Sequence, residues 1–194
     1  MVNEQPFQIV GIAGSLRRAS WNRGLIRAAA DEAPEGTEIV ILDIAILPLY
    51  NQDQEDIGDP PSVIALKDVI RLADALLIAT PEYNNGMSGV LKNAIDWASR
   101  PWGQNSFDHM PAAVIGASIG SIGTAVAQQS LRGVLSFCNA RQMTAPEAYI
   151  HLRPGAIADS GEVSDDGLAQ VLTDFMQEFR THTERVLTVL PRST

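Results

Sequence analysis

The fold is decided near the N-terminus by residues 7–32, which read FQIVGIAGSLRRASWNRGLIRAAADE. The stretch begins at 7–12 with a short, nearly continuous apolar run, typical of a strand that is covered on both faces in a parallel sheet. It ends at 22–32 with apolar side chains spaced for one face of a helix. A loop of small, hydroxyl and basic residues lies between the two. This succession of strand, loop and helix predicts the repeating unit of an α/β fold.

The same alternation continues along the chain. Further short runs rich in valine, isoleucine and leucine predict strands at 38–42, 74–79, 112–117 and 142–150. Amphipathic spacing predicts further helices at 61–72, 89–99, 123–137 and 167–190. Strands that alternate with helices imply right-handed crossovers, and therefore one open, doubly wound parallel sheet with helices on both faces. Periodicity leaves the strand order open, and we expect long loops at 43–60 and 151–166.

Length and composition indicate a single domain that spans residues 1–194, since 45% of the residues are hydrophobic and no linker interrupts the chain. The single cysteine, Cys138, cannot form an internal disulfide, and the N-terminus lacks a signal-peptide pattern, so we expect a cytoplasmic protein. No apolar run reaches the roughly 20 residues that cross a bilayer, which argues against membrane insertion. A net charge of −9 argues against a nucleic-acid partner.

The loop after the first predicted strand combines groups that bind a small anion. Four arginines and no carboxylate lie between Ser15 and Arg27. In an open α/β sheet the ligand lies beyond the carboxyl ends of the strands, where this loop is expected. Hydroxyl, carboxamide and guanidinium groups, together with the free N–H groups of a helix start, can surround one phosphate dianion. The side chains concerned are Ser15, Arg17, Ser20 and Asn22, and Asn22 is also expected to cap the helix.

Two other phosphate-binding patterns fit this loop poorly. A dinucleotide fingerprint requires glycines at the positions that hold Gly11, Ala13 and Leu16, so only the first position matches. A P-loop requires a Gly-Lys-Ser/Thr sequence, which is missing. Asp43, just past the second predicted strand, could bind a ribose hydroxyl and leaves a dinucleotide-binding dehydrogenase open as a minor alternative.

Two more loops leave predicted strands at the same edge of the sheet. Residues 80–89 read TPEYNNGMSG, in which proline fixes the turn while asparagine and glycine tolerate positive φ, so backbone amides can face a planar ligand. Residues 118–123 read SIGSIG, and their small side chains let backbone N–H groups approach a ligand where negative charge develops. Tyr83 adds an aromatic face, while Glu82 is expected to be a solvated turn carboxylate rather than a proton donor.

The remaining polar residues predict no second chemistry. The histidines, His109, His151 and His182, are far apart and give no metal-ligand spacing with one cysteine, so no metal is expected. Cys138 ends an apolar helix and is expected in the core rather than as a nucleophile. Trp97 lies on the apolar stripe of its predicted helix and fits either the core or a subunit contact.

Three motifs make the sequence recognisable: GSLR at 14–17 with Ser20 and Asn22, TPEYN at 80–84, and GVLKNAIDW at 89–97. With these motifs the chain resembles the NADPH-dependent FMN reductase family, which includes chromate, quinone and azo-dye reductases. The resemblance covers essentially the whole chain in order. It implies a flavodoxin-like, five-stranded parallel sheet in the order 2-1-3-4-5, with FMN at the point where the winding reverses.

The resemblance also implies which residues bind the cofactor. It assigns the FMN phosphate to the first loop, the isoalloxazine to the second loop, and the pyrimidine edge of that ring to the third loop. The residues implied are Ser15, Arg17, Ser20 and Asn22, then Pro81, Glu82, Tyr83 and Asn84, then Ser118 and Gly120. Met87-Ser88 and the single glycine before Thr124 depart from the family pattern beside the flavin, where they concern the choice of acceptor.

The activity that the resemblance implies is NAD(P)H-dependent reduction. NADPH or NADH gives hydride to FMN and leaves before a small-molecule acceptor takes its place, in a ping-pong cycle with no catalytic side chain. Quinone, azo, nitro, chromate or flavin acceptors fit an open flavin face. The alternative is a flavin-bearing electron carrier or regulatory binding protein that turns over NAD(P)H slowly. Family members are usually homodimers or homotetramers, with each flavin near the subunit boundary.

Overall fold

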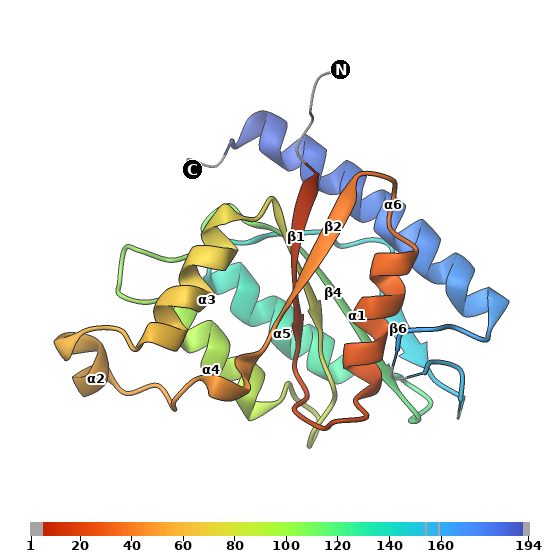
Figure 1. Ribbon diagram of the computed structural model, residues 1–194, viewed down its shortest axis with the longest axis horizontal. Helices are drawn as coiled ribbons and strands as arrows, with labels where there is room; N and C mark the ends of the chain where they lie inside the picture. The colour runs from red at the N-terminus through yellow and green to blue at the C-terminus, as the bar shows by residue number, and fades with distance from the viewer. Residues whose placement is uncertain (1–5, 154, 159, 192–194) are drawn as a thin grey trace.

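The computed structural model describes residues 6–153, 155–158 and 160–191, and its strands form a sheet in which every pairing is parallel (Figure 1). The order is β2-β1-β3-β4-β5, and β6 also pairs with β4. This confirms the predicted flavodoxin-like order, in which the winding reverses between β1 and β3. The strands are β1 (Phe7–Ala13), β2 (Thr37–Leu42), β3 (Ala75–Ala79), β4 (Pro111–Ser118), β5 (Arg141–Gln142) and β6 (Ala148–His151).

The last predicted strand, 142–150, is wrong as a continuous element. β5 lies beside the first residues of β4, and β6 lies beside its last residues. Met143 N still donates to the Ala112 carbonyl of β4 at 2.8 Å, and residues 144–147 then leave the ladder. Pro146 lies in this interval, and proline has no N–H group to donate to a neighbouring strand. Two short strands therefore share the fifth position of the sheet.

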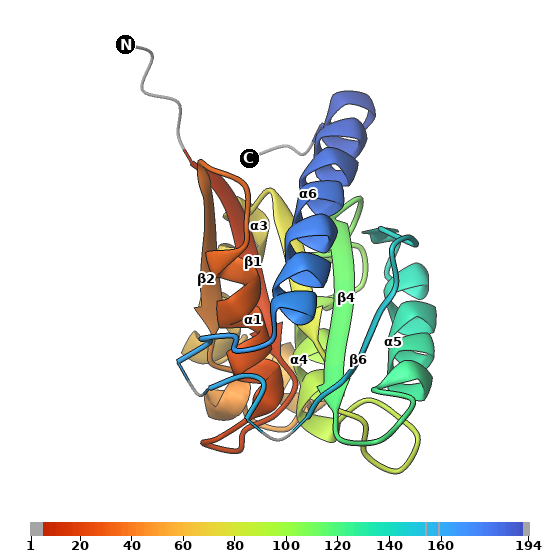
Figure 2. The same cartoon turned by 90° about the vertical axis from the view of Figure 1, so that its right-hand side faces the viewer.

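Helices cover both faces of the sheet, as predicted. The helices α1 and α6 pack on one face, and α3, α4 and α5 pack on the other (Figure 1 and Figure 2). Among the described residues, none of these helices combines the length and the apolar character that a bilayer crossing requires. Their bounds lie within two residues of the predicted ones: α1 (Trp21–Asp31), α3 (Pro61–Leu72), α4 (Gly89–Ala98), α5 (Ala125–Phe137) and α6 (Asp166–Val189).

The strands divide the core into two layers, because successive side chains of a strand point to opposite faces of the sheet. In β3, where every residue is buried, Leu77 packs in the layer of α1 and α6. Its neighbours Leu76 and Ile78 pack in the layer of α3, α4 and α5. Burial on both faces explains why the central strands are continuous apolar runs without a polar side.

The predicted loop 43–60 contains two short helices, η1 (Ile44–Ile46) and α2 (Gln52–Ile57). No residue of α2 is buried, so this helix has no apolar face for a sequence pattern to reveal. The loop is nevertheless attached to α4. Trp97 Nε1 donates to the Pro48 carbonyl over 2.9 Å, and the Tyr50 ring meets the Trp97 ring edge-on with centroids 5.0 Å apart. Trp97 is fully buried and therefore belongs to the core.

Glu55 provides a second attachment for this loop. Its carboxylate accepts hydrogen bonds from the Tyr50 hydroxyl at 2.8 Å and from Arg100 Nε at 3.1 Å. Burial by itself raises the pKa of Glu55, but these hydrogen bonds and the charge of Arg100 outweigh it and leave the pKa below its ordinary value. The contribution of Glu55 to stability is therefore present near neutral pH and is lost as the pH falls through the lowered pKa.

Gly116 sets the distance between the middle of the sheet and the start of α5. A β-carbon at this position would overlap the Thr124 hydroxyl and would lie 2.5 Å from the Thr80 carbonyl oxygen. Both neighbours are fully buried, so neither can move aside into solvent. The absence of a side chain at Gly116 thus permits β3, β4 and α5 to approach closely beneath the carboxyl edge.

We expect Gly116→Ala to lower the free energy of unfolding by about 1–3 kcal/mol, because the added methyl group meets backbone and a buried hydroxyl. Gly133→Ala is the matched control, since Gly133 lies within α5 with open space around it, and the change should raise stability by up to about 1 kcal/mol. Urea unfolding followed by circular dichroism measures both variants. Equal stability of the two would contradict this packing.

Candidate functional site

The loops that follow β1, β3 and β4 meet at the carboxyl edge of the sheet, where they enclose a hollow of about 320 Å³. This is the edge at which an open α/β sheet binds its ligand. The predicted residues that line the hollow are Ser15, Arg17, Ser20, Asn22, Pro81, Glu82, Tyr83 and Ser118. Trp21 and Ala117 complete the lining, while Asn84 and Gly120 lie in the same loops outside it.

Gly14 allows the first two loops to touch. A β-carbon at Gly14 would lie 2.9 Å from Pro81 Cδ and 3.2 Å from the Ser88 hydroxyl. Both backbone groups of Gly14 are hydrogen-bonded. Its N–H donates to the Ala79 carbonyl at 2.9 Å, and its carbonyl accepts from Ser88 Oγ at 2.5 Å. The two loops are therefore held in one arrangement by backbone contacts that a side chain at this position would block.

Ser20 is the residue that caps α1. Its side chain accepts a hydrogen bond from the N–H of Arg23 at 3.4 Å, and its backbone is extended. The prediction that Asn22 is the N-cap is wrong, since Asn22 is already inside the helix. First-turn N–H groups have no acceptor within a helix, so the start of α1 offers N–H donors and a partial positive charge beside the hollow.

Asn22 uses its side chain to hold β4. Its Oδ1 accepts from the N–H of Ala117 at 2.9 Å, and its Nδ2 donates to the carbonyl of Ala117 at 3.1 Å. Asn22 is buried, so these two bonds replace hydrogen bonds that water cannot provide there. The predicted contact of Asn22 with a phosphate stays a prediction, and the backbone N–H and the second Nδ2 hydrogen remain for it.

Arg17 carries the positive charge of the site. Its guanidinium lies 4.9 Å from the centre of the Trp21 ring, a cation–π arrangement. Among the described residues no carboxylate forms an ion pair with Arg17. Sequence reasoning missed Trp21, because Arg17 lies in a loop, where the spacing between two residues does not predict that their side chains meet. The ring orients the guanidinium without neutralising it, which leaves the charge for a ligand.

The second loop brings an aromatic ring to the other side of the hollow. The Tyr83 hydroxyl lies 3.3 Å from the buried Ser15 hydroxyl, and the Tyr83 ring is half-exposed. Tyr83 and Gly86 exchange two backbone hydrogen bonds, of 3.0 and 3.1 Å, which close a tight turn. Asn84 and Asn85 have φ angles of 52° and 59° in this turn, the left-handed region that asparagine tolerates, as predicted.

These groups fit FMN. A terminal phosphate is a dianion that binds hydroxyl, guanidinium and N–H donors, and the first loop offers all three beside a helix start. The half-exposed Tyr83 and the polar turn that follows suit a flat ring at the other end of the same ligand. Within the described ranges, no group of three or more His, Cys, Asp or Glu side chains is placed to hold a metal ion.

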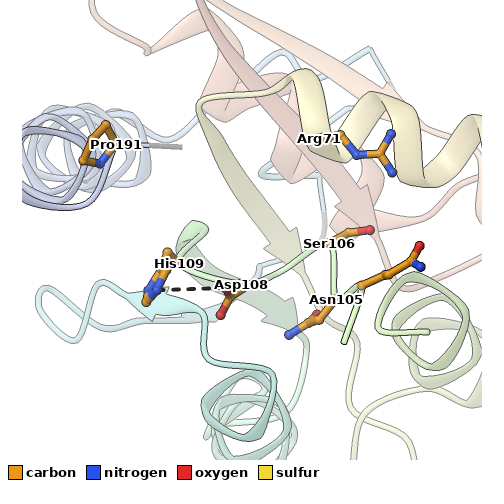
Figure 3. Close-up of a pocket in the computed structure, with 7 residues that line it drawn as sticks. Arg71, Asn105, Ser106, Asp108, His109 and Pro191 are labelled. Carbon is orange, nitrogen blue, oxygen red and sulfur yellow. Dashed lines mark ion pairs between the residues drawn. The ribbon is translucent and has the colours of Figure 1, made fainter. Parts of the chain in front are cut away.

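A larger hollow of about 390 Å³ lies at the amino edge of the sheet, among Arg71 near the end of α3, residues of the segment before β4, and Pro191 after α6 (Figure 3). Its arginine and histidine side chains already have partners. Arg71 pairs with Asp68 at 2.8 Å, and His109 lies 3.9 Å from Asp108. This hollow therefore lacks the unpaired guanidinium and the helix start that distinguish the one at the carboxyl edge.

Two residues for which the sequence predicts no functional role, Cys138 and His182, have structural roles. Cys138 is 5% exposed, and burial raises the pKa of its thiol, which confirms the prediction of a core position. His182 lies within 2.8 Å of the Arg141 carbonyl, far along the chain from the loops of the site.

Asp43, on which the dinucleotide alternative rests, accepts from the N–H of Ala45 at 3.0 Å and lies outside the lining of the hollow.

A doubly wound parallel sheet in the order β2-β1-β3-β4-β5 defines the class of flavodoxin-like proteins. Within that class the chain belongs to the NADPH-dependent FMN reductase family, whose sequence profile matches residues 7–154.

Individual relatives agree with this assignment. A 2-hydroxy-1,4-benzoquinone reductase from a Burkholderia species is 46% identical over 173 residues, which cover 89% of this chain and 93% of that protein. An NAD(P)H-dependent FMN reductase from Pseudomonas aeruginosa is 42% identical over 92% of this chain and 96% of its own. FerB, a flavoenzyme NAD(P)H:(acceptor) oxidoreductase from Paracoccus denitrificans, has a solved structure that is 43% identical and superposes with a TM-score of 0.87, covering 92% of this chain and 97% of that one.

These findings confirm the predicted family, fold and enzyme class. The chain is an NAD(P)H-dependent oxidoreductase with FMN as its cofactor. The dinucleotide-binding dehydrogenase is thereby set aside. The assignment of individual residues to the phosphate and the ring stays a prediction, which the geometry of the hollow supports.

We expect Asn22→Ala to lower the free energy of unfolding by about 2–3 kcal/mol, because it leaves both backbone groups of Ala117 without their partner. It should also weaken FMN binding, since β4 forms part of the hollow. Asn93→Ala is the matched control, because the Asn93 carboxamide bonds the backbone of Tyr50 and Pro48 in the same way away from the hollow. Denaturant unfolding and FMN titration of the apoproteins measure both effects. Equal loss of FMN affinity in the two variants would contradict a specific role of Asn22.

Proposed function

We propose that the hollow at the carboxyl edge binds FMN and that the protein uses it to reduce quinones with NADPH or NADH. The observation that carries the proposal is the guanidinium of Arg17, which has no ion-pair partner among the described residues and lines the hollow with the capped start of α1. The phosphate is assigned to Ser15, Arg17, Ser20 and Asn22, and the ring to Pro81, Glu82, Tyr83, Asn84, Ser118 and Gly120.

The residues of the chain bind and orient the cofactor. FMN, when bound, supplies the acceptance of hydride from NAD(P)H and the delivery of electrons to the acceptor. The Trp21 ring holds Arg17 in place for the phosphate, and the contact between the Ser15 and Tyr83 hydroxyls links the phosphate loop to the ring loop. No side chain of the hollow is required as a nucleophile, so the proposal contains no catalytic residue.

Two observations favour quinones among the possible acceptors. The loops that line the hollow also carry exposed apolar side chains, namely Leu16, Ile119 and Ile122, and a flat, weakly polar acceptor is suited to such loops. The Burkholderia relative is named a 2-hydroxy-1,4-benzoquinone reductase, and a relative from Pseudomonas putida, 40% identical over 83% of this chain and 87% of its own, is named a quinone reductase.

Anaerobic stopped-flow mixing distinguishes a reductase from an electron carrier. We expect NADPH or NADH to bleach the oxidised flavin absorbance of the FMN-loaded protein within the time of one turnover, and a benzoquinone added afterwards to restore it. The measurement is the flavin absorbance with each nicotinamide in turn. A yellow band that persists with both donors would support the carrier instead, and bleaching without reoxidation by quinone would exclude quinones as acceptors.

We expect Arg17→Ala to raise the dissociation constant of FMN by about 10- to 100-fold, because a charge-assisted contact with the phosphate is lost. Arg17→Lys should give an intermediate value, since it keeps the charge and loses the planar fork. Arg18→Ala is the control, because Arg18 is adjacent, exposed and outside the lining. Calorimetric titration of the apoproteins with FMN measures the constants, and an equal effect of Arg17→Ala and Arg18→Ala would place the phosphate elsewhere.

We also propose that the chain forms homodimers or homotetramers through the groove between α4 and α5. Two adjoining hollows of about 420 and 380 Å³ form this groove and share Ser99, Phe137 and Cys138. Trp102 and Phe137 on its rim are each 81% exposed, which is typical of a surface that a partner covers.

A second copy is the occupant that the charges of the groove favour. Lys92 and Asp96 lie one turn apart on α4 and pair at 2.7 Å within the groove. A two-fold axis across antiparallel α4 helices would bring Lys92 near Asp96 of the partner subunit, and the same symmetry would then bring Asp96 near Lys92 of the partner subunit. The same patch on both subunits is then complementary to itself.

We expect Trp102→Ser combined with Phe137→Ser to shift the protein toward the monomer, since both changes remove apolar area from the groove. Leu72→Ser is the control, because Leu72 is 71% exposed and belongs to α3. Size-exclusion chromatography with light scattering gives the mass of each variant across a range of protein concentrations. Unchanged mass in the double variant would place the subunit contact on another surface.

A further inference from the structure

Glu82 lies in the loop after β3 but bonds to α5, 45 residues further along the chain. Its Oε2 accepts a hydrogen bond from the N–H of Ala127 over 2.9 Å. Ala127 belongs to the first turn of α5, where backbone N–H groups have no acceptor within the helix. Glu82 therefore caps α5 from a different loop, and the prediction of a solvated turn carboxylate is wrong.

The helix takes this outside acceptor because its own N-cap residue is engaged elsewhere. Thr124 makes no capping hydrogen bond with its side chain, although threonine at this position ordinarily binds a first-turn N–H. Its hydroxyl instead accepts from Gln128 Nε2 at 3.1 Å and lies against Gly116, and the residue is fully buried. Because the Thr124 hydroxyl is occupied at the close contact between β4 and α5, the first-turn N–H of Ala127 is capped by Glu82 instead.

The bond connects the second and third loops of the FMN site. Glu82 and Ser118 both line the hollow, and residues 119–124 join Ser118 to the start of α5. Within that segment Gly120 N donates to Ser118 Oγ at 3.0 Å, and Gly123 N donates to the Gly120 carbonyl at 3.0 Å. The third loop is therefore a compact turn whose far end is fixed where Glu82 holds α5.

The bond also places a carboxylate at the positive end of a helix, on the wall of the hollow. The first-turn N–H groups of α5 carry a partial positive charge that would favour negative charge on a nearby ligand. Glu82 offsets part of this charge, and its own negative charge opposes the addition of electrons to a ligand bound beside it. The side chain thus acts on both the shape and the electrostatic potential of the hollow.

We propose that Glu82 is a positioning residue that joins the second and third loops of the FMN site through α5 and lowers the midpoint potential of the bound flavin. The inference rests on the proposed function, because it requires FMN in this hollow. It assigns no proton transfer to Glu82.

Three variants of the full chain test the inference. Glu82→Ala removes the acceptor, whereas Glu82→Gln keeps an acceptor oxygen and removes the charge. Asp165→Ala is the matched control, since Asp165 Oδ1 caps α6 by accepting from the N–H of Leu168 at 3.1 Å, outside the lining of the hollow. Each protein is freed of FMN and reloaded. The measurements are the melting temperature of the apoprotein, the dissociation constant of FMN, and the midpoint potential by equilibration with a reference dye.

We expect Glu82→Ala to lower the melting temperature and to raise the dissociation constant of FMN about tenfold, the effect of losing one hydrogen bond to a charged group. Glu82→Gln should change the dissociation constant by less than about threefold and should raise the midpoint potential. Asp165→Ala should lower the melting temperature while leaving the dissociation constant and the midpoint potential at their wild-type values. A residue that only stabilised the fold would behave as Asp165 does in all three measurements.

Wild-type affinity for FMN in Glu82→Ala would overturn the positioning role, and an unchanged or lowered midpoint potential in Glu82→Gln would overturn the electrostatic role. If Glu82→Ala does not fold, the midpoint potential of Glu82→Gln still tests the electrostatic role, and its dissociation constant for FMN still tests the positioning role. Wild-type protein that takes up no FMN would instead overturn the proposed function, before any variant is compared.

Discussion

The double hydrogen bond between the Asn22 carboxamide and the backbone of Ala117 joins the start of α1 to the end of β4. These two elements carry the first and third loops of the site, yet β3 separates β1 from β4 in the sheet, so no ladder connects them. Asn22 supplies the missing pair of bonds in the form that a neighbouring strand would give, one donated and one accepted. Because the carboxamide is buried, water cannot replace either bond, and the separation of the two loops depends on this one side chain.

The regular part of the fold could be predicted because burial leaves a clear pattern there. β3 is apolar without interruption since both of its faces are covered, and α4 buries one apolar face, so the sequence indicates both. The hydrophobic pattern fails to predict the structure where burial does not determine it. α2 has no buried residue, and the break between β5 and β6 contains Pro146, whose missing N–H hydrophobicity does not report.

The features of the candidate site also fall into two groups. Some are set by the local sequence and could be predicted, whereas others are set by contacts between distant residues and could not. Residue types and the family resemblance indicated the loops and most of the side chains that line the hollow, because loop composition is a local property. The partners of those side chains could not be predicted. Asn22 bonds a residue 95 positions away, and Glu82 bonds one 45 positions away, so no spacing within a single element signals either contact. Each contact exists only because the parallel sheet gathers strand ends from distant parts of the chain.

The burial of Cys138 has a consequence for the proposed reduction of quinones. Quinones accept electrons, but they are also electrophiles that form covalent adducts with thiolates. Cys138 is the single cysteine of the chain, it is 5% exposed, and its raised pKa keeps it in the protonated, weakly nucleophilic form. If quinones are the acceptors, as proposed, the buried thiol gives them no reactive sulfur, and the enzyme is protected from arylation by the molecules that it reduces.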